Sequence, residues 1–365
     1  KIIGNQSAEG WFPEYGGADP GYQTLCMYYL AQVYLDNPTE KLRSAMEQSL
    51  DFLQYFVHPD GSFGGEYGSR RTEIYYPGGI ALLAKNFEVA EQMHARMAAS
   101  ISSGSTTNLI DIDMGNTAPL LSNYILAEKI HSKNKKADSL PINELSATKF
   151  FKSAGILIQS SPKFYTILGA SNGGTVKIFN KKTNALVYED SGVLGETEEG
   201  NNIWMHATHL ATPITIDGNS IDTSSLFYIP GSQIPTPLKF VLLRIGNLSF
   251  MRFRFINEFI KKTLVKMLIT RKSPVPLKRI RKITFNQDSI TIKDKIVKTS
   301  PISIRKLIQG EKFSTIHMAS SRYFSPSQLC RRYTHSFDLE TLQETGSVSQ
   351  SILINLKNDA PVQIK

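Results

Sequence analysis

The feature that most constrains the fold of this chain is a change of hydrophobic period between residues 132 and 149. Before this change, apolar residues recur three and four positions apart, as between Thr39 and Val57, which is the pattern of an amphipathic helix. After it, short runs rich in β-branched and aromatic residues are separated by Gly, Asn, Asp and Ser. We therefore predict an α+β fold class, with a helical part that precedes an antiparallel β part.

The length of 365 residues also favours two domains, because a single hydrophobic core stops growing at about 250–300 residues. A polar stretch with several lysines marks the boundary between them. We predict a helical domain over 1–135, a linker over 136–149 and an antiparallel β-sandwich over 150–365. Within the first domain we expect helices over residues 21–34, 39–57, about 77–97 and about 116–130.

An internal repeat links two loops of the helical part. Trp11-Phe12-Pro13-Glu14-Tyr15-Gly16 returns 52 residues later as Phe63-Gly64-Gly65-Glu66-Tyr67-Gly68, and each copy is followed by a helical pattern. A loop plus two helices at this period is typical of a toroid or solenoid of helical hairpins. Equivalent loops of such an array lie at one rim, so we expect these two to lie together.

Three short segments carry a family resemblance. They are Asp60-Gly61-Ser62-Phe63 with Glu66-Tyr67-Gly68, the stretch from Phe150 to Ile156, and the strand pair from Lys278 to Asp294. The first resembles a loop at the catalytic rim of hyaluronate and chondroitin lyases, and the other two resemble strands of the heparinase II/III-like group. More broadly, the chain resembles the polysaccharide lyases that join an (α/α) toroid to an antiparallel β-sandwich. The four or five helices that the pattern predicts imply an incomplete toroid. The sequence also has no Gly-His-x-His-x-Asp segment of the kind that supplies sandwich histidines in the heparinase II/III-like group.

The resemblance implies cleavage next to a uronic acid by β-elimination, with an acidic polysaccharide as partner and no cofactor. A cation or donor must offset the carboxylate, a base must remove the C5 proton, and an acid must protonate the leaving oxygen. In this reading Tyr67 is the base or acid, Arg70 or Arg71 offsets the uronate, and Tyr75 or Tyr76 stacks on or protonates the sugar. The full set of candidates is His58, Tyr67, Arg70, Arg71, Tyr75 and Tyr76 for catalysis, and Glu14, Tyr15, Tyr22, Glu66, Glu73 and Asn116 for substrate binding.

Other interpretations of the same loops remain open. Glu66 and Glu73 can pair with Arg70 and Arg71 to hold the loop shut, while the tyrosines pack against the rim. A glycoside hydrolase would use two carboxylates such as Glu14 and Glu66, roughly 5–9.5 Å apart. A uronate C5-epimerase begins with the same proton abstraction, and a non-catalytic glycan-handling protein of an exopolysaccharide or capsule system needs no catalysis.

The net charge of +9 is concentrated in one segment. Residues 239–283 hold thirteen lysines and arginines against one acid, Glu258, for a local charge of +12, so the rest of the chain nets −3. We predict a basic amphipathic insertion at about 239–275, which either docks on an anionic membrane surface, binds an acidic glycan, or packs its apolar face on the sandwich. No nucleic-acid motif accompanies the charge. A periplasmic or extracellular location is favoured, and docking of this segment on a membrane would make the protein membrane-peripheral.

The sequence offers only weak metal candidates, and we expect no metal. Asp111 and Asp113 precede a predicted helix, where such residues are usually caps. His206 and His209 are three positions apart in a strand-like run, which places them on opposite faces. Longer apolar runs are also missing, since no stretch of 18 or more uncharged apolar residues occurs in the sequence.

Overall fold

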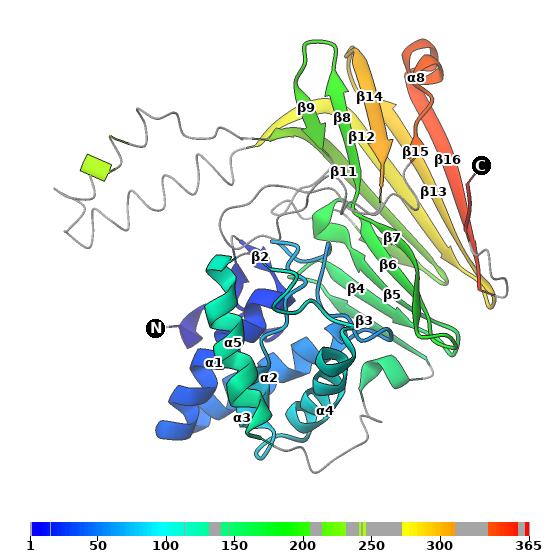
Figure 1. Cartoon of the computed structure of the whole chain (residues 1–365). Coiled ribbons are helices and arrows are strands. Elements are labelled where there is room, and N and C mark those ends of the chain that lie inside the picture. The colour runs from blue at the N-terminus through cyan, green and yellow to red at the C-terminus, as the bar shows by residue number, and fades with distance from the viewer. Residues whose placement is uncertain are drawn as a thin grey trace.

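The structure, a computed structural model, describes residues 2–14, 16–112, 114–130, 140–144, 146–204, 214–230, 241, 244–245, 272–310, 335–356 and 362–364. Its N-terminal part is helical (Figure 1). The helices of this part are α1 (Pro20–Asp36), α2 (Glu40–Leu53), α3 (Pro77–Leu83), α4 (Glu88–Ser103) and α5 (Met114–Glu128), with 3-10 turns at Ile3–Asn5 and Gln54–Phe56. A short hairpin of β1 (Pro13–Glu14) and β2 (Gly17–Ala18) precedes α1.

The third expected helix is in fact two helices, α3 and α4, so that prediction is wrong at residues 84–87. Phe87 is 8% exposed and packs on the ring of Tyr34, 6.1 Å away between centroids, which requires the chain to turn there. Glu88 and Glu91 then begin a new helix, because acidic side chains stabilise a helix N-terminus. Gly79 lets α3 approach α1 closely, since a Cβ there would lie 2.5 Å from the backbone of Met27.

The C-terminal part consists of two antiparallel sheets, as predicted. The first sheet is a meander of β3 (Ala147–Phe151), β4 (Ile156–Ser160), β5 (Phe164–Gly169), β6 (Thr175–Asn180) and β7 (Ala185–Asp190). The second, ten-stranded sheet runs in the order β15-β14-β8-β9-β11-β12-β13-β16-β17, with β10 paired to β11. Its strands are β8 (Val193–Thr197), β9 (Asn202–Trp204), β10 (Ile214–Asp217), β11 (Ser220–Pro230), β12 (Lys272–Phe285), β13 (Ser289–Lys298), β14 (Ile304–Gln309), β15 (His335–Ser336), β16 (Ser347–Asn355) and β17 (Val362–Ile364), and helix α8 (Leu339–Thr345) precedes β16.

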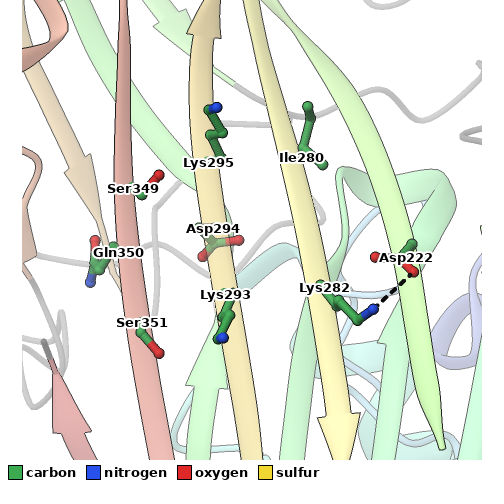
Figure 2. A pocket seen from close by; sticks show the side chains of 9 residues that line it. All are labelled: Asp222, Ile280, Lys282, Lys293, Asp294, Lys295, Ser349, Gln350 and Ser351. Atoms are coloured by element: carbon green, nitrogen blue, oxygen red, sulfur yellow. Dashed lines mark ion pairs between the residues drawn. The ribbon is translucent and has the colours of Figure 1, made fainter.

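The five-stranded sheet is the middle of three layers, between the helices and the ten-stranded sheet (Figure 1). One face, with Tyr165 and Ile167, shares a core with helical residues, and the other, with Phe164 and Leu168, packs on the ten-stranded sheet. All six residues of β5 are therefore buried, which explains its continuous apolar run. In contrast, β13 alternates, because its outer face is exposed to solvent (Figure 2).

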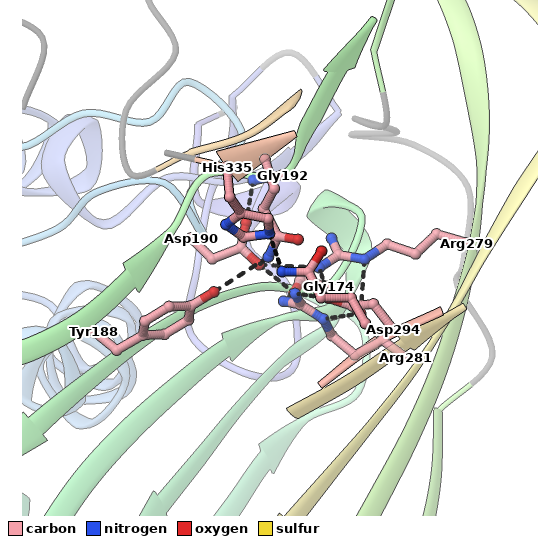
Figure 3. Close-up of polar contacts among 10 residues, drawn as sticks. Gly174, Tyr188, Asp190, Gly192, Arg279, Arg281, Asp294 and His335 are labelled. Carbon is pink, nitrogen blue, oxygen red and sulfur yellow. Dashed lines mark hydrogen bonds and ion pairs between the residues drawn. The ribbon is translucent and has the colours of Figure 1, made fainter. Parts of the chain in front are cut away.

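A buried charged cluster lies where the end of β7 meets β12 and β13 (Figure 3). Arg279 and Arg281 on β12 face Asp294 on β13 and Asp190 at the end of β7, and all four are 1–2% exposed. The Asp294 carboxylate accepts two hydrogen bonds from each arginine at 2.7–2.9 Å. Asp190 pairs with both arginines and also accepts a hydrogen bond from Gln309 at 2.8 Å. Two positive and two negative groups thus balance within the apolar interior.

The structure describes only parts of the predicted basic insertion and of the predicted linker. Residues 272–275 of the predicted basic insertion are the start of β12, and most of the remainder, like His206 and His209, lies outside the described residues. Leu140 and Ile142, in the predicted linker, belong to the core that the helices share with the five-stranded sheet. Among the helices that the structure describes, none is long and apolar enough to cross a membrane.

Candidate functional site

The two repeated loops lie side by side, at the junction of the helices and the five-stranded sheet. We call residues 11–19 and 57–76 together the rim. The Ser69 hydroxyl donates to the Glu14 carbonyl at 2.7 Å, and the Ser69 amide donates to the Ala18 carbonyl at 2.8 Å. These contacts join the first segment of the rim to the second.

Asp19, which caps α1, holds the second loop in place. One carboxylate oxygen accepts the Tyr22 amide at 3.0 Å, and the other accepts the amides of Arg70 at 2.8 Å and Thr72 at 3.3 Å. Asp19 is 1% exposed, and burial raises its pKa although these hydrogen bonds oppose the shift. Asp19 therefore fixes the second loop of the rim against the N-terminus of α1.

Arg70 is the slightly more exposed of the two arginines of the rim, and it contacts both Tyr22 and Glu14. Its guanidinium lies 4.4 Å from the ring centroid of Tyr22 and donates to the Glu14 carboxylate at 2.9 Å. The Arg70 side chain is 11% exposed and the Glu14 side chain 31% exposed. A stacked and ion-paired arginine is held in one orientation, which suits it to meet a carboxylate.

A chain of hydrogen bonds runs beneath this surface and ends at Tyr67. The Asp60 carboxylate accepts from the Ser62 hydroxyl at 2.7 Å, which in turn lies 2.7 Å from His58 Nδ1. His58 Nε2 lies 2.8 Å from the Tyr67 hydroxyl. Burial lowers the pKa of His58 well below its ordinary value and raises that of Tyr67 well above its own, so both side chains are neutral near pH 7.

Acidic and basic side chains fix the remainder of the second loop. Arg71 Nε lies 3.2 Å from the Glu66 carboxylate, with both side chains 8% exposed. Lys177 on β6 lies 3.0 Å from the Glu73 carboxylate and 2.8 Å from that of Glu189 on β7. Glu66 thus has the arginine partner that the loop-closing interpretation expects. Glu73 is instead paired with a residue from the β part.

Lys177 and Glu189 are components of the site that the sequence did not reveal. Both are more than 100 residues from the loop that they hold, and no motif surrounds them. One signal was present: Lys177 interrupts the apolar run Val176-Lys177-Ile178-Phe179, in a strand buried on both faces. A lysine in such a strand requires a buried acidic partner.

Most of the expected catalytic residues point inward. His58, Tyr67, Tyr75 and Tyr76 are 0–2% exposed, Tyr75 packs on Phe63, and its hydroxyl has no hydrogen-bond partner among the described residues. With so little exposed surface, none of these four side chains can stack on a sugar in this structure. Of the other candidates, Tyr22 is half-buried, Asn116 lies within α5, and Tyr15 lies outside the described residues.

Asp111 is the metal candidate of the sequence that lies in the described part of the chain. There, no group of three His, Cys, Asp or Glu side chains is arranged to hold a metal ion. Asp111 accepts the backbone amide of Asn108 at 3.0 Å, as a turn residue does, and Asp113 lies outside the described residues.

Glu66 predicts a dependence of stability on pH. Burial raises its pKa from 4.5 to about 7, opposed by Arg71 and supported by the nearby carboxylates of Glu189 and Glu73. The folded protein therefore binds the Glu66 proton more tightly than the unfolded chain does. The contribution of this proton to the free energy of unfolding is complete below pH 4.5 and is lost as the pH rises through 7. We expect Glu66→Gln to flatten this fall in the free energy of unfolding by up to about 3 kcal/mol.

Urea unfolding at pH 5 and pH 7.5 measures this effect. The matched change Glu47→Gln, at an exposed position of α2, should leave the difference between the two pH values as it is in the wild type. Parallel pH profiles for the wild type and Glu66→Gln would contradict the assignment.

Comparison with known proteins gives distant structural matches. No protein-family model and no curated protein matches it. Among solved structures, it is similar to the chondroitin AC lyase of Streptomyces coelicolor A3 in complex with chondroitin sulphate, with a TM-score of 0.44 and 12% identity, over 83% of this chain and 43% of that chain. A tyrosine-to-alanine mutant of that lyase gives a TM-score of 0.43 and 10% identity, over 98% of this chain and 53% of that chain.

A second kind of enzyme is similar over the same share of the chain. The 4-alpha-glucanotransferase from Thermococcus litoralis gives a TM-score of 0.31 and 7% identity, over 83% of this chain and 43% of that chain. The chain thus spans about half the length of each of these proteins.

Proposed function

We propose that the rim acts on an acidic, uronate-containing polysaccharide by removing the C5 proton of the uronate, with β-elimination of the glycosidic bond. The observation that carries this proposal is the position of Arg70, between the Tyr22 ring and the Glu14 carboxylate where the two loops meet. A uronate carboxylate can replace Glu14 as the partner of this guanidinium. Neutralising that carboxylate makes the adjacent C5 proton easier to remove.

Tyr22 is our candidate for the proton-transferring group. Among the expected tyrosines that the structure describes, it is the one that is not fully buried, and it lies directly beside Arg70. Tyr67, which the sequence favoured for this role, is 1% exposed and hydrogen-bonded to His58. We assign Tyr67 and His58 to supporting the loop, because a buried neutral phenol does not meet the C5 carbon of a bound sugar.

The arrangement of carboxylates favours elimination over hydrolysis. A glycoside hydrolase needs two carboxyl groups on either side of the scissile bond. The Glu66 side chain is 8% exposed and paired with Arg71, whereas the Glu14 side chain is 31% exposed and paired with Arg70, so the two do not form a pair of exposed carboxylates. An epimerase shares the first step, and it differs by returning the proton to the other face of the sugar.

The direct test is absorbance of the unsaturated product in the ultraviolet, on incubation with polygalacturonate, alginate, chondroitin sulphate and hyaluronate. We expect product from at least one of these polymers. Tyr22→Phe keeps the ring under Arg70 and removes the hydroxyl, so it should lower the rate by about 10²–10⁴-fold while the protein stays folded.

Two results would count against this assignment. Absence of product across the whole panel would reject a lyase, and deuterium uptake from solvent without cleavage would indicate the epimerase. Full activity of Tyr22→Phe, with a lyase confirmed, would remove Tyr22 from the reaction.

A further inference from the structure

The outer face of the ten-stranded sheet carries a group of lysines that the rim does not use. Successive residues of a strand point to opposite faces, so the strands that bury Arg279, Arg281 and Asp294 turn their neighbours outward. The outward residues Lys282, Lys293 and Lys295 are all exposed. Strand register places Lys282 directly opposite Lys293, and Lys295 follows on the same face of β13.

The pairing of Lys282 with Lys293 is expected to lower the stability of the sheet. Like charges directly opposite on neighbouring strands repel each other. Two acids lie beside these lysines in the described part of the chain. Asp294 is buried and paired with Arg279 and Arg281, and the carboxylate of Asp222 on β11 is 3.9 Å from Lys282 Nζ, with both side chains more than 40% exposed. Within the described residues, Lys293 and Lys295 form no ion pair. The positive charge of this face is therefore available to an external anion.

Protection against aggregation does not account for these lysines. Lysine commonly blocks the edge strands of a sheet, where unpaired backbone groups could recruit another chain. Both β12 and β13 lie in the interior of this sheet, paired on each side. The lysines of these two strands therefore do not protect an edge strand.

The three lysines line a hollow over β12 and β13, and serine hydroxyl groups of β16 border it (Figure 2). Its volume is about 500 Å³, enough for part of a saccharide chain, and Ser349 and Ser351 on β16 line it opposite Lys295 and Lys293. Lysine offers charge to carboxylate or sulphate groups, and serine offers hydrogen bonds to sugar hydroxyls. Ile280 is the one apolar residue among those that line it, and no aromatic side chain is present among them.

We propose that this hollow, which we call the lysine face, is a second binding site for an acidic polysaccharide, separate from the rim. Single-stranded nucleic acid binds where bases can stack on aromatic side chains, which the described lining does not provide. An anionic membrane would require a broad apolar surface beside the charge, and Ile280 alone does not form one. The lysine face would hold a polymer by its charges, and this requires no catalysis at the rim.

The test compares two triple variants of equal charge in direct binding assays without turnover. Lys282→Gln/Lys293→Gln/Lys295→Gln removes the lysine face, and Lys41→Gln/Lys85→Gln/Lys182→Gln removes three exposed lysines elsewhere. Calorimetry with chondroitin sulphate, with polygalacturonate and with neutral dextran gives the affinities. We expect the first variant to bind the acidic polymers about tenfold more weakly than the wild type, with less dependence on salt, and the second to bind as the wild type does.

Several outcomes would overturn the proposal. They are unchanged binding by the first variant, equal weakening in both variants, equally tight binding of dextran, or binding of phosphatidylglycerol vesicles in place of the polysaccharides. The melting temperature should stay equal or rise in the first variant, because the repulsion between Lys282 and Lys293 is removed. Arg70→Ala separates the two sites: a loss of binding in that variant alone would assign the polymer to the rim.

Discussion

Replacing Asp294 by asparagine should lower the free energy of unfolding by about 3–5 kcal/mol, the largest effect on stability that we expect from a single substitution in the sandwich. The carboxylate of Asp294 accepts four hydrogen bonds from Arg279 and Arg281, and all three side chains are 1% exposed. Its removal leaves two buried guanidinium groups with Asp190 as their remaining carboxylate. Urea unfolding followed by circular dichroism measures the loss.

Asp222→Asn is the matched control, because it makes the same chemical change on a nearby strand of the same sheet. Asp222 is exposed and 3.9 Å from its lysine, so its replacement should change the free energy of unfolding by less than about 0.5 kcal/mol. Equal destabilisation by the two substitutions would show that the buried cluster contributes no special stability.

Replacing Arg70 by alanine should lower kcat/KM on the cleaved polysaccharide by about 10²–10³-fold, if the rim is the site of elimination. Alanine removes the positive charge that we place against the uronate carboxylate, and it leaves Glu14 without the partner that it has at 2.9 Å. Initial rates of product absorbance provide the measurement. Arg70→Lys should restore only part of the rate, because an ammonium group cannot reproduce the two-pronged contact of a guanidinium.

Arg43 offers a control of similar geometry. Its guanidinium also lies over an aromatic ring, that of Phe87 at 5.1 Å, but on α2. Arg43→Ala should therefore leave kcat/KM within about twofold of the wild type. A rate for Arg70→Ala close to that of Arg43→Ala would exclude Arg70 from the reaction.

The sequence was sufficient for the fold class because its two hydrophobic periods reflect burial directly. The continuous apolar run of β5 and the alternation of β13 correspond to a strand covered on both faces and a strand covered on one. The break between α3 and α4 was not predictable locally, because it depends on the packing of Phe87 against Tyr34, more than 50 residues earlier. Boundaries that arise from such distant contacts leave little trace in a local pattern.

For the site, the sequence predicted the right loops but not the direction of their side chains. A tyrosine in a glycine-rich loop resembles a surface residue, yet Tyr67 is covered by β5, where Gly169 approaches so closely that a Cβ would lie 2.8 Å from the Tyr67 Cα. Glu73 also lies in this loop, and its side chain is directed by Lys177, which comes from the β part. The strands β5 and β6 therefore determine which residues of the loop face solvent, and the sequence of the loop alone does not reveal these contacts.

The contacts of Lys177 and Asn172 have a consequence for how this protein can change over evolutionary time. Asn172 donates to the carbonyls of Glu66 and Gly68, and Lys177 is paired with Glu73, so the second loop of the helical part is held by the β part. A recombination that exchanged either part alone would separate this loop from the residues that order it. The two parts are therefore expected to be inherited as one unit, with changes at residues 66–73 accompanied by changes at 172–189.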